Sequence, residues 1–260
     1  TVTVRRRSIK TNFTIMVAIF KGLLLMALVF TFGCKERAVN KQQDKAAEMV
    51  VEIPDTAKAQ KPQKEEVSKP VLKSLDGLVD TLFVRLADYS ADFDYDLRYA
   101  TENNFLKAKV YDCAECYTRV KTARALLMAN KEFMDKGYRI KFFDCYRPND
   151  VQYKMWAIVP NPQYVANPVK GSIHNKGGAV DITLVTLDGE ELDMGTDFDF
   201  FGKKAYHDNR DLPETVLGNR LLLKETMEKH GFWSIRTEWW HYNLGTASND
   251  KVANFKWDCD

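Results

Sequence analysis

The segment Ser172-Ile173-His174-Asn175-Lys176-Gly177-Gly178-Ala179-Val180-Asp181 decides how the chain folds around its most unusual residues. Its two adjacent glycines permit a sharp turn after the histidine. From Gly178 to Thr186 the side chains then alternate with the two-residue period of a β-strand. Val180 and Ile182 are expected to face the core, and Asp181 is expected on the opposite, polar face.

A second segment, Glu238-Trp239-Trp240-His241, adds another carboxylate and another imidazole. Two imidazoles and one carboxylate form a three-ligand zinc site with an open position for water, and a further carboxylate near that water supplies a general base. The residue types therefore predict His174, Asp181 and His241 as ligands of one Zn²⁺ ion per domain, with Glu238 as the base. Because residues three apart on a regular strand face opposite sides, Glu238 and His241 share a site only if the strand begins after Glu238 or carries a bulge.

Each of these pieces, taken alone, has a plainer structural interpretation. His174 beside glycines fits a loop, Asp181 fits an exposed strand position, and the segment around Trp239 fits an aromatic core. The remaining histidines are interpreted as a surface residue, His207, and as a residue interacting with a helix dipole, His230. The joint pattern, and no single residue, favours the metal site.

The rest of the chain mixes helices and strands without a regular βαβ rhythm, which favours the α+β class. Helices are predicted at 118–136 and 217–230, each with a glycine suited to a helix C-terminus. Strands are predicted at 138–145, 178–186 and 239–244. We expect a single domain over residues 71–260, with a small central antiparallel sheet flanked by helices.

The composition is that of an ordinary globular protein, with 260 residues, 45% apolar residues and a formal net charge of +2. No basic stripe accompanies Trp239 and Trp240, so nucleic acid is not an expected partner. The oligomeric state is left open by the sequence.

The N-terminal region has the features of an export signal. Met16 is a candidate start, followed by Lys21, the apolar run 22–33 and Cys34, which resembles the lipidated cysteine of a lipoprotein. Residues 1–34 are interpreted as this signal segment, the alternative being an uncleaved anchor over residues 15–33. Residues 35–70, rich in Lys, Glu, Gln and Ala, are interpreted as a disordered tether. The expected location is the periplasm or cell envelope, with the membrane contacted only through the N-terminal anchor.

Apart from Cys34, the chain contains Cys113, Cys116, Cys145 and Cys259. Outside the cytoplasm an even number of cysteines favours disulfides, here with three possible pairings. Free thiols, a second zinc site and a redox function of the Cys-x-x-Cys motif are the alternatives.

The two histidine segments resemble the signature of the zinc D-Ala-D-Ala peptidases, in which Ser-x-His, six further residues and Asp are followed distally by Glu-x-x-His. Three further segments resemble the D-alanyl-D-alanine dipeptidases, including those linked to vancomycin resistance. They are Asp96–Thr101 with Asn103–Phe105, Asp144–Pro148, and Met194–Asp199. Cys145 stands where the family's Gly-Tyr-Arg-Pro motif has glycine. The motifs follow the family order from about residue 90 to 245 and cover most of the predicted domain.

The resemblance implies catalytic roles for Glu238 and Arg147. Glu238 would take a proton from the attacking water and pass it to the leaving amine, and Arg147 would stabilise the developing oxyanion. A fixed guanidinium suits that role better than an ammonium group does. Asp144 would help to orient Arg147.

The resemblance also implies how the substrate is held. Asp199 would pair with the free ammonium group of a dipeptide, while Tyr99 and Ser172 would line the small pocket. An acylated amine would leave Asp199 buried and unpaired, so that longer peptides are rejected.

The resulting expectation is zinc-dependent hydrolysis of D-alanyl-D-alanine, or a similar small D,D-dipeptide, in the bacterial cell envelope. A zinc D,D- or L,D-carboxypeptidase that trims peptidoglycan peptides is one alternative. A non-catalytic zinc-binding module is the other, although such a module has no need of Glu238 or Arg147.

Overall fold

The structure is a computed structural model that describes residues 71–259. The predicted signal segment 1–34, with Met16 and Cys34, and the predicted tether 35–70 lie outside the described residues. Across residues 71–259, no helix has both the length and the apolar character needed to span a membrane.

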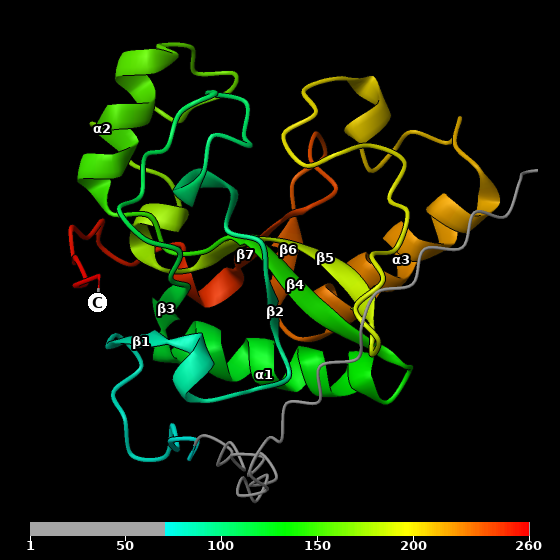
Figure 1. Ribbon diagram of the computed structural model, residues 1–260, viewed down its shortest axis with the longest axis horizontal. Helices are drawn as coiled ribbons and strands as arrows, with labels where there is room; N and C mark the ends of the chain where they lie inside the picture. The colour runs from blue at the N-terminus through cyan, green and yellow to red at the C-terminus, as the bar shows by residue number, and fades with distance from the viewer. Residues whose placement is uncertain (1–70, 260) are drawn as a thin grey trace, which may run out of the picture. The chain divides into compact units, whose positions relative to one another are not determined.

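A five-stranded sheet forms the centre of the fold, with the strand order β2-β4-β5-β7-β6 (Figure 1). Its strands are β2 (Asp94–Tyr95), β4 (Tyr138–Asp144), β5 (Ala179–Thr186), β6 (Phe232–Ser234) and β7 (His241–Leu244). Four of them pair antiparallel, as expected, whereas β2 runs parallel to β4. The parallel pair arises because a helical crossover separates β2 from β4 in the chain.

Strands β1 (Phe83–Arg85) and β3 (Tyr117–Arg119) form a separate antiparallel pair. The helices are α1 (Val120–Met134), α2 (Asn149–Ile158) and α3 (Glu214–Lys229). Five short 3-10 helices complete the described elements: η1 (Leu86–Asp88), η2 (Arg98–Ala100), η3 (His174–Lys176), η4 (Lys203–Ala205) and η5 (Gly245–Ala247). Helix α1 packs against β4 and α3, and α3 packs against β6 (Figure 1). The expected α+β class, with a central sheet flanked by helices, is confirmed.

Strand β5 is the buried centre of this sheet. The apolar side chains expected in the core, Val180, Ile182 and Leu184, have no exposed surface. The opposite face is also covered, because Thr183 is fully buried and Asp181 is only 4% exposed. Asp181 therefore lies inside the protein, where a charge must be paired or bound to a cation.

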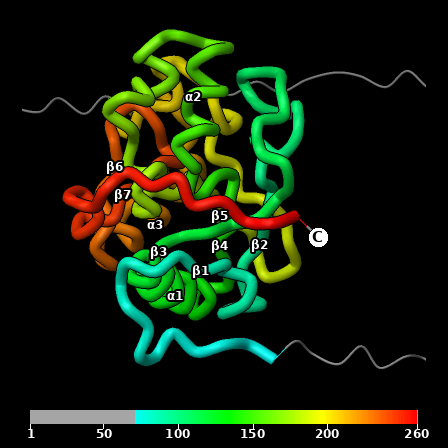
Figure 2. The backbone as a smooth tube through the Cα atoms, turned by 90° about the vertical axis from the view of Figure 1, so that its left-hand side faces the viewer, coloured from blue at the N-terminus to red at the C-terminus, as the bar shows by residue number. Residues whose placement is uncertain are grey.

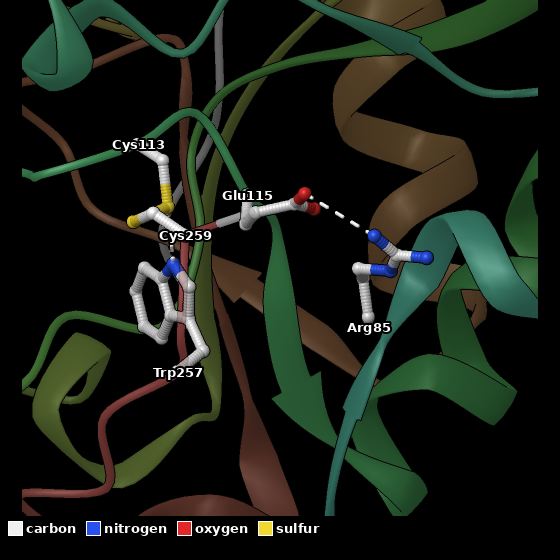
Figure 3. Close-up of a disulfide and its surroundings, with 5 residues drawn as sticks. All are labelled: Arg85, Cys113, Glu115, Trp257 and Cys259. Carbon is white, nitrogen blue, oxygen red and sulfur yellow. Dashed lines mark hydrogen bonds and ion pairs between the residues drawn. A yellow bond between two sulfur atoms is a disulfide. The ribbon is translucent and has the colours of Figure 1, made fainter.

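The four described cysteines form two disulfides, Cys113–Cys259 and Cys116–Cys145. The prediction of disulfides is confirmed, and the free-thiol, zinc and redox alternatives are wrong for these cysteines. Figure 3 shows the first disulfide beside Trp257, whose indole N–H donates to the Cys113 sulfur over 3.2 Å, and near the Arg85–Glu115 ion pair.

The C-terminal segment 251–259 lies across the surface beside β3 and the start of α2 (Figure 2). The Ala253 N–H donates to the Asn175 carbonyl oxygen over 2.8 Å, and the Phe255 ring stacks on Phe83 at 5.1 Å. The Cys113–Cys259 disulfide fastens the end of the segment. The C-terminal segment is thus part of the folded domain.

The two glycines that precede β5 are needed for different reasons. Gly177 has a φ of +73°, in the left-handed region that disfavours other residues. The φ of Gly178 is not in this left-handed region, but a Cβ atom there would overlap the Cβ atom of Ala247. The turn predicted from the sequence is therefore confirmed, together with a close approach that the sequence did not reveal.

We expect Gly178→Ala to lower the free energy of unfolding by about 1–3 kcal/mol, because the added methyl group overpacks the contact with Ala247. The double variant Gly178→Ala/Ala247→Gly removes the opposing methyl group and should recover most of the loss. Urea unfolding of the full chain measures both changes. A neutral Gly178→Ala, or a double variant no more stable than Gly178→Ala, would contradict the contact.

Candidate metal centre and active site

Three adjacent strands each carry one acidic or imidazole residue, and the sheet register places these residues opposite one another. In the sheet register Asp144 of β4 faces Asp181 of β5, and Asp181 faces His241 of β7. The register between β4 and β5 shifts between Phe142 and Asp144, and this irregularity brings Asp144 opposite Asp181. The sheet itself therefore aligns these three residues.

His174 joins this row from η3, just before the glycine turn. One ligand atom each from His174, Asp181 and His241 lies within 4.8 Å of the others. His241 Nδ1 is 2.9 Å from the Asp181 carboxylate and 3.2 Å from His174 Nε2. The structure thus brings together all three residues predicted as metal ligands.

The outer nitrogen of each imidazole is engaged by a carbonyl oxygen. His174 Nδ1–H donates to the Cys145 backbone carbonyl over 2.7 Å, and His241 Nε2–H donates to the Asn243 side-chain carbonyl over 3.0 Å. In neutral imidazoles with the ring protons on these outer nitrogens, His174 Nε2 and His241 Nδ1 are available as metal ligands. Two nitrogen lone pairs and a carboxylate oxygen then converge, so the residues fit a metal ion with a tetrahedral preference.

Glu238 lies on the loop between β6 and β7, and β7 begins at His241. The strand therefore starts after Glu238, which is one of the two arrangements that allow both residues to share a site. Burial raises the pKa of Glu238, and its charged neighbours include His241, Asp181 and His174. A carboxylate with a raised pKa beside a metal site suits a general base that works near neutral pH.

Arg147 is held in a fixed orientation just after β4. It is 7% exposed, it forms an ion pair with Asp144, and its Nη1–H donates to the Gln152 side-chain oxygen over 3.0 Å. Burial alone would lower the pKa of Arg147, but Asp144 raises it well above its ordinary value. Its guanidinium lies 5.2 Å from the centre of the Tyr99 ring. The group is thus a permanent, oriented cation.

Asp199 and Tyr99 form the part of the site that was predicted to hold the substrate. The Tyr99 hydroxyl donates to the Asp199 carboxylate at 3.1 Å. Burial, together with the charge of Asp181, raises the pKa of Asp199 well above its ordinary value. No Lys, Arg or His within residues 71–259 forms an ion pair with Asp199. This partly buried carboxylate lacks a protein cation, and a ligand ammonium group would supply one.

Ser172 has a local partner, since its hydroxyl and its backbone N–H both donate to the Asn175 side-chain oxygen. Its role in lining the pocket stays a prediction. His207 and His230 lie outside the His174 group: His230 pairs with Glu132 at 2.9 Å. His207 is partly buried rather than a surface residue, because its loop packs beside Tyr242 of β7.

Four residues that support the site were not predicted from the sequence. The Tyr111 hydroxyl donates to Asp144 over 2.7 Å, and the Asn175 side-chain amide donates to the Arg147 carbonyl over 2.8 Å. Gln152 and Asn243 are the others. Asn243 lies two residues after His241, and because residues two apart on a strand share one face, the sequence could have predicted that Asn243 lies beside His241. Tyr111 is distant in sequence from Asp144, so no local pattern could have predicted their contact.

The fold and the arrangement of these residues define a metallopeptidase. The chain matches the family model described as D-ala-D-ala dipeptidase over residues 80–258, and it belongs to that family.

Two curated relatives carry the name D-alanyl-D-alanine dipeptidase. The protein of Escherichia coli (strain K12) is 32% identical over 179 residues, covering 69% of this chain and 93% of the relative. The protein of Enterococcus faecalis (strain ATCC 700802 / V583) is 31% identical over 171 residues, covering 58% of this chain and 85% of the relative. A solved vancomycin resistance D,D-pentapeptidase in complex with Zn(II) overlaps this chain at a TM-score of 0.34 with 15% identity. The overlap covers 50% of this chain and 73% of that one.

Removing the hydrogen-bond partner of His241 should weaken metal binding. We expect Asn243→Ala to bind Zn²⁺ about 10–100-fold less tightly, because His241 loses the acceptor that orients its ring. Competition with a chelator measures the affinity. Asn243→Asp keeps an acceptor oxygen and serves as the matched control. Equal affinity in Asn243→Ala and the unaltered chain would rule out this orienting role.

Proposed function

We propose that this chain hydrolyses D-alanyl-D-alanine to D-alanine, with one Zn²⁺ ion held by His174, Asp181 and His241. The observation that carries the proposal is Asp199, a partly buried carboxylate that forms no ion pair with any residue between 71 and 259. A free dipeptide brings the missing ammonium group, whereas an acylated peptide does not. The names of the relatives support the same substrate.

The chain's own residues divide the work of the reaction. When bound, Zn²⁺ supplies a Lewis acid that polarises the scissile carbonyl group. Glu238 takes a proton from the attacking water and delivers it to the leaving amine. Arg147, held by Asp144 and Gln152, stabilises the oxyanion that develops on the carbonyl oxygen. No side-chain nucleophile is required.

Substrate selection follows from the opposite end of the site. Asp199 and Tyr99 bind the substrate ammonium group, and Ser172 lines the pocket nearby. Because Asp199 forms no ion pair within the described part of the chain, a substrate that lacks a free ammonium group leaves this carboxylate unpaired. Asp199 therefore favours the free dipeptide because binding of a blocked or extended peptide would cost the free energy of leaving this carboxylate unpaired.

The location is part of the proposal. The signal segment 1–34, lipidated at Cys34, and the tether 35–70 would hold the enzyme in the cell envelope. The two disulfides support a compartment outside the cytoplasm, where they form and persist.

Glu238→Gln is expected to lower kcat on D-Ala-D-Ala by about 10²–10⁴-fold, because the amide cannot accept the proton of the attacking water. The full chain, loaded with Zn²⁺, is assayed for release of D-alanine from D-Ala-D-Ala and from N-acetyl-D-Ala-D-Ala. Cleavage of the acetylated substrate at a comparable rate would point to a carboxypeptidase. Bound zinc without cleavage of either substrate would point to a binding module.

Asp199→Asn is expected to raise KM for D-Ala-D-Ala and to reduce the preference for the free over the acetylated dipeptide by about 10–100-fold, the effect of losing a charged hydrogen bond. Asp197→Asn alters an exposed carboxylate on the same loop and should leave both values unchanged. An unchanged preference in Asp199→Asn would remove Asp199 from ammonium binding.

A further inference from the structure

The four-residue segment Asp144–Arg147 supplies three different polar groups to the site. Asp144 forms the ion pair with Arg147, the Cys145 backbone carbonyl accepts the hydrogen bond from His174, and Arg147 is the oriented cation. The position of one short segment therefore sets the positions of both a metal-binding imidazole and the guanidinium. A shift of this segment would disturb both at once.

Regular sheet pairing does not extend through this segment. Strand β4 ends at Asp144, its register with β5 already shifts between Phe142 and Asp144, and α2 begins only at Asn149. Two backbone hydrogen bonds remain, from the Tyr146 N–H to the Tyr117 carbonyl and from the Arg147 N–H to the His174 carbonyl. Two side-chain contacts add to these bonds, because the Cys145 carbonyl accepts from His174 and the Arg147 carbonyl accepts from the Asn175 amide. Beyond the end of β4 the segment is thus held by contacts with η3 and β3 instead of by regular sheet pairing.

A covalent bond supplies the additional constraint. Cys145, at the centre of the segment, is bonded to Cys116, which directly precedes β3. Strand β3 continues without a break into α1, a helix packed against β4. The disulfide therefore ties the segment to the β3–α1 unit, which is also bonded to the turn before β5 because the Arg119 N–H donates to the Gly177 carbonyl over 3.1 Å.

The two disulfides differ in their surroundings. Cys116 and Cys145 are 3% and 2% exposed, within the core. Cys259 is exposed, and Cys113 is half-buried beside Trp257 (Figure 3). The Cys113–Cys259 bond fastens the C-terminal segment and supplies no group to the His174–Asp181–His241 row. It therefore offers a matched control for the inner disulfide.

We infer that the Cys116–Cys145 disulfide is a positioning element of the active site. It holds the Cys145 carbonyl in place to accept the hydrogen bond from His174, and it holds Arg147 in position to contact the substrate. Cys145 stands where the family motif described above has glycine, so this constraint belongs to this chain's own sequence. The inference rests on the proposed function for the role of Arg147, and on the metal site alone for the role of His174.

The test compares two double variants of the full chain, Cys116→Ala/Cys145→Ala and Cys113→Ala/Cys259→Ala. Each removes one disulfide and leaves no unpaired partner. The inner variant is expected to bind Zn²⁺ at least about tenfold less tightly, because the carbonyl that orients His174 is released. It should also lose at least about tenfold in kcat, with KM for D-Ala-D-Ala little changed, because Arg147 acts in the transition state. The outer variant should match the unaltered chain in all three values.

A purely structural role gives a different result. Both variants would then lower the melting temperature, while zinc affinity and kcat of the folded protein would stay unchanged, and the inference would be overturned. If the inner variant does not fold, Cys116→Ala/Cys145→Val refills the apolar volume and takes its place. Failure of both to fold, where the outer variant folds, would assign the disulfide to stability alone. Should the unaltered chain not cleave D-Ala-D-Ala, the proposed function fails, and the zinc affinities still decide the inference.

Discussion

The pairing of β4, β5 and β7 is the constraint on which the site depends. It brings Asp144, Asp181 and His241 to facing positions, and the glycine turn then adds His174 from the side. Three atoms with lone pairs converge in a buried place, an arrangement that is unfavourable unless a cation lies between them. The hydrophobic core of β5 and the carbonyl oxygens behind both imidazoles hold the groups there. A metal ion bound by these groups would therefore stabilise the folded domain.

The carboxylates of the site have different surroundings, and this gives them different chemistry. Burial alone would raise the pKa of Asp181, but His174 and His241 hold it below the usual range, which suits a permanent metal ligand. Burial raises the pKa of Glu238, which suits a proton carrier. Burial also raises the pKa of Asp199, and among the side chains of residues 71–259 only Tyr99 donates a hydrogen bond to its carboxylate. Similar side chains are thus suited to the separate tasks proposed for them because their neighbours differ.

The sequence predicted those features that depend on local pattern. The alternation around Ile182 predicted β5, and the helical period predicted α1 and α3 to within a few residues. Helix α2 and the three-residue β6 were not predicted, because Pro148 reads as a strand end and short elements carry little periodicity. The disulfide pairing and the Tyr111–Asp144 contact depend on residues far apart in the chain, which no local period reveals.

The location of the disulfides bears on why the chain has them. A domain of this size buries enough apolar surface to fold without cross-links, unlike the small secreted domains that need them. Neither disulfide joins strands of the central sheet. One closes the C-terminal segment over the aromatic side chains of Tyr117 and Tyr146, and the other fixes the residue between Asp144 and Tyr146. Only the Cys116–Cys145 bond therefore acts where β4 ends and regular hydrogen-bonded pairing stops, which is where a covalent constraint bears directly on the geometry of the site.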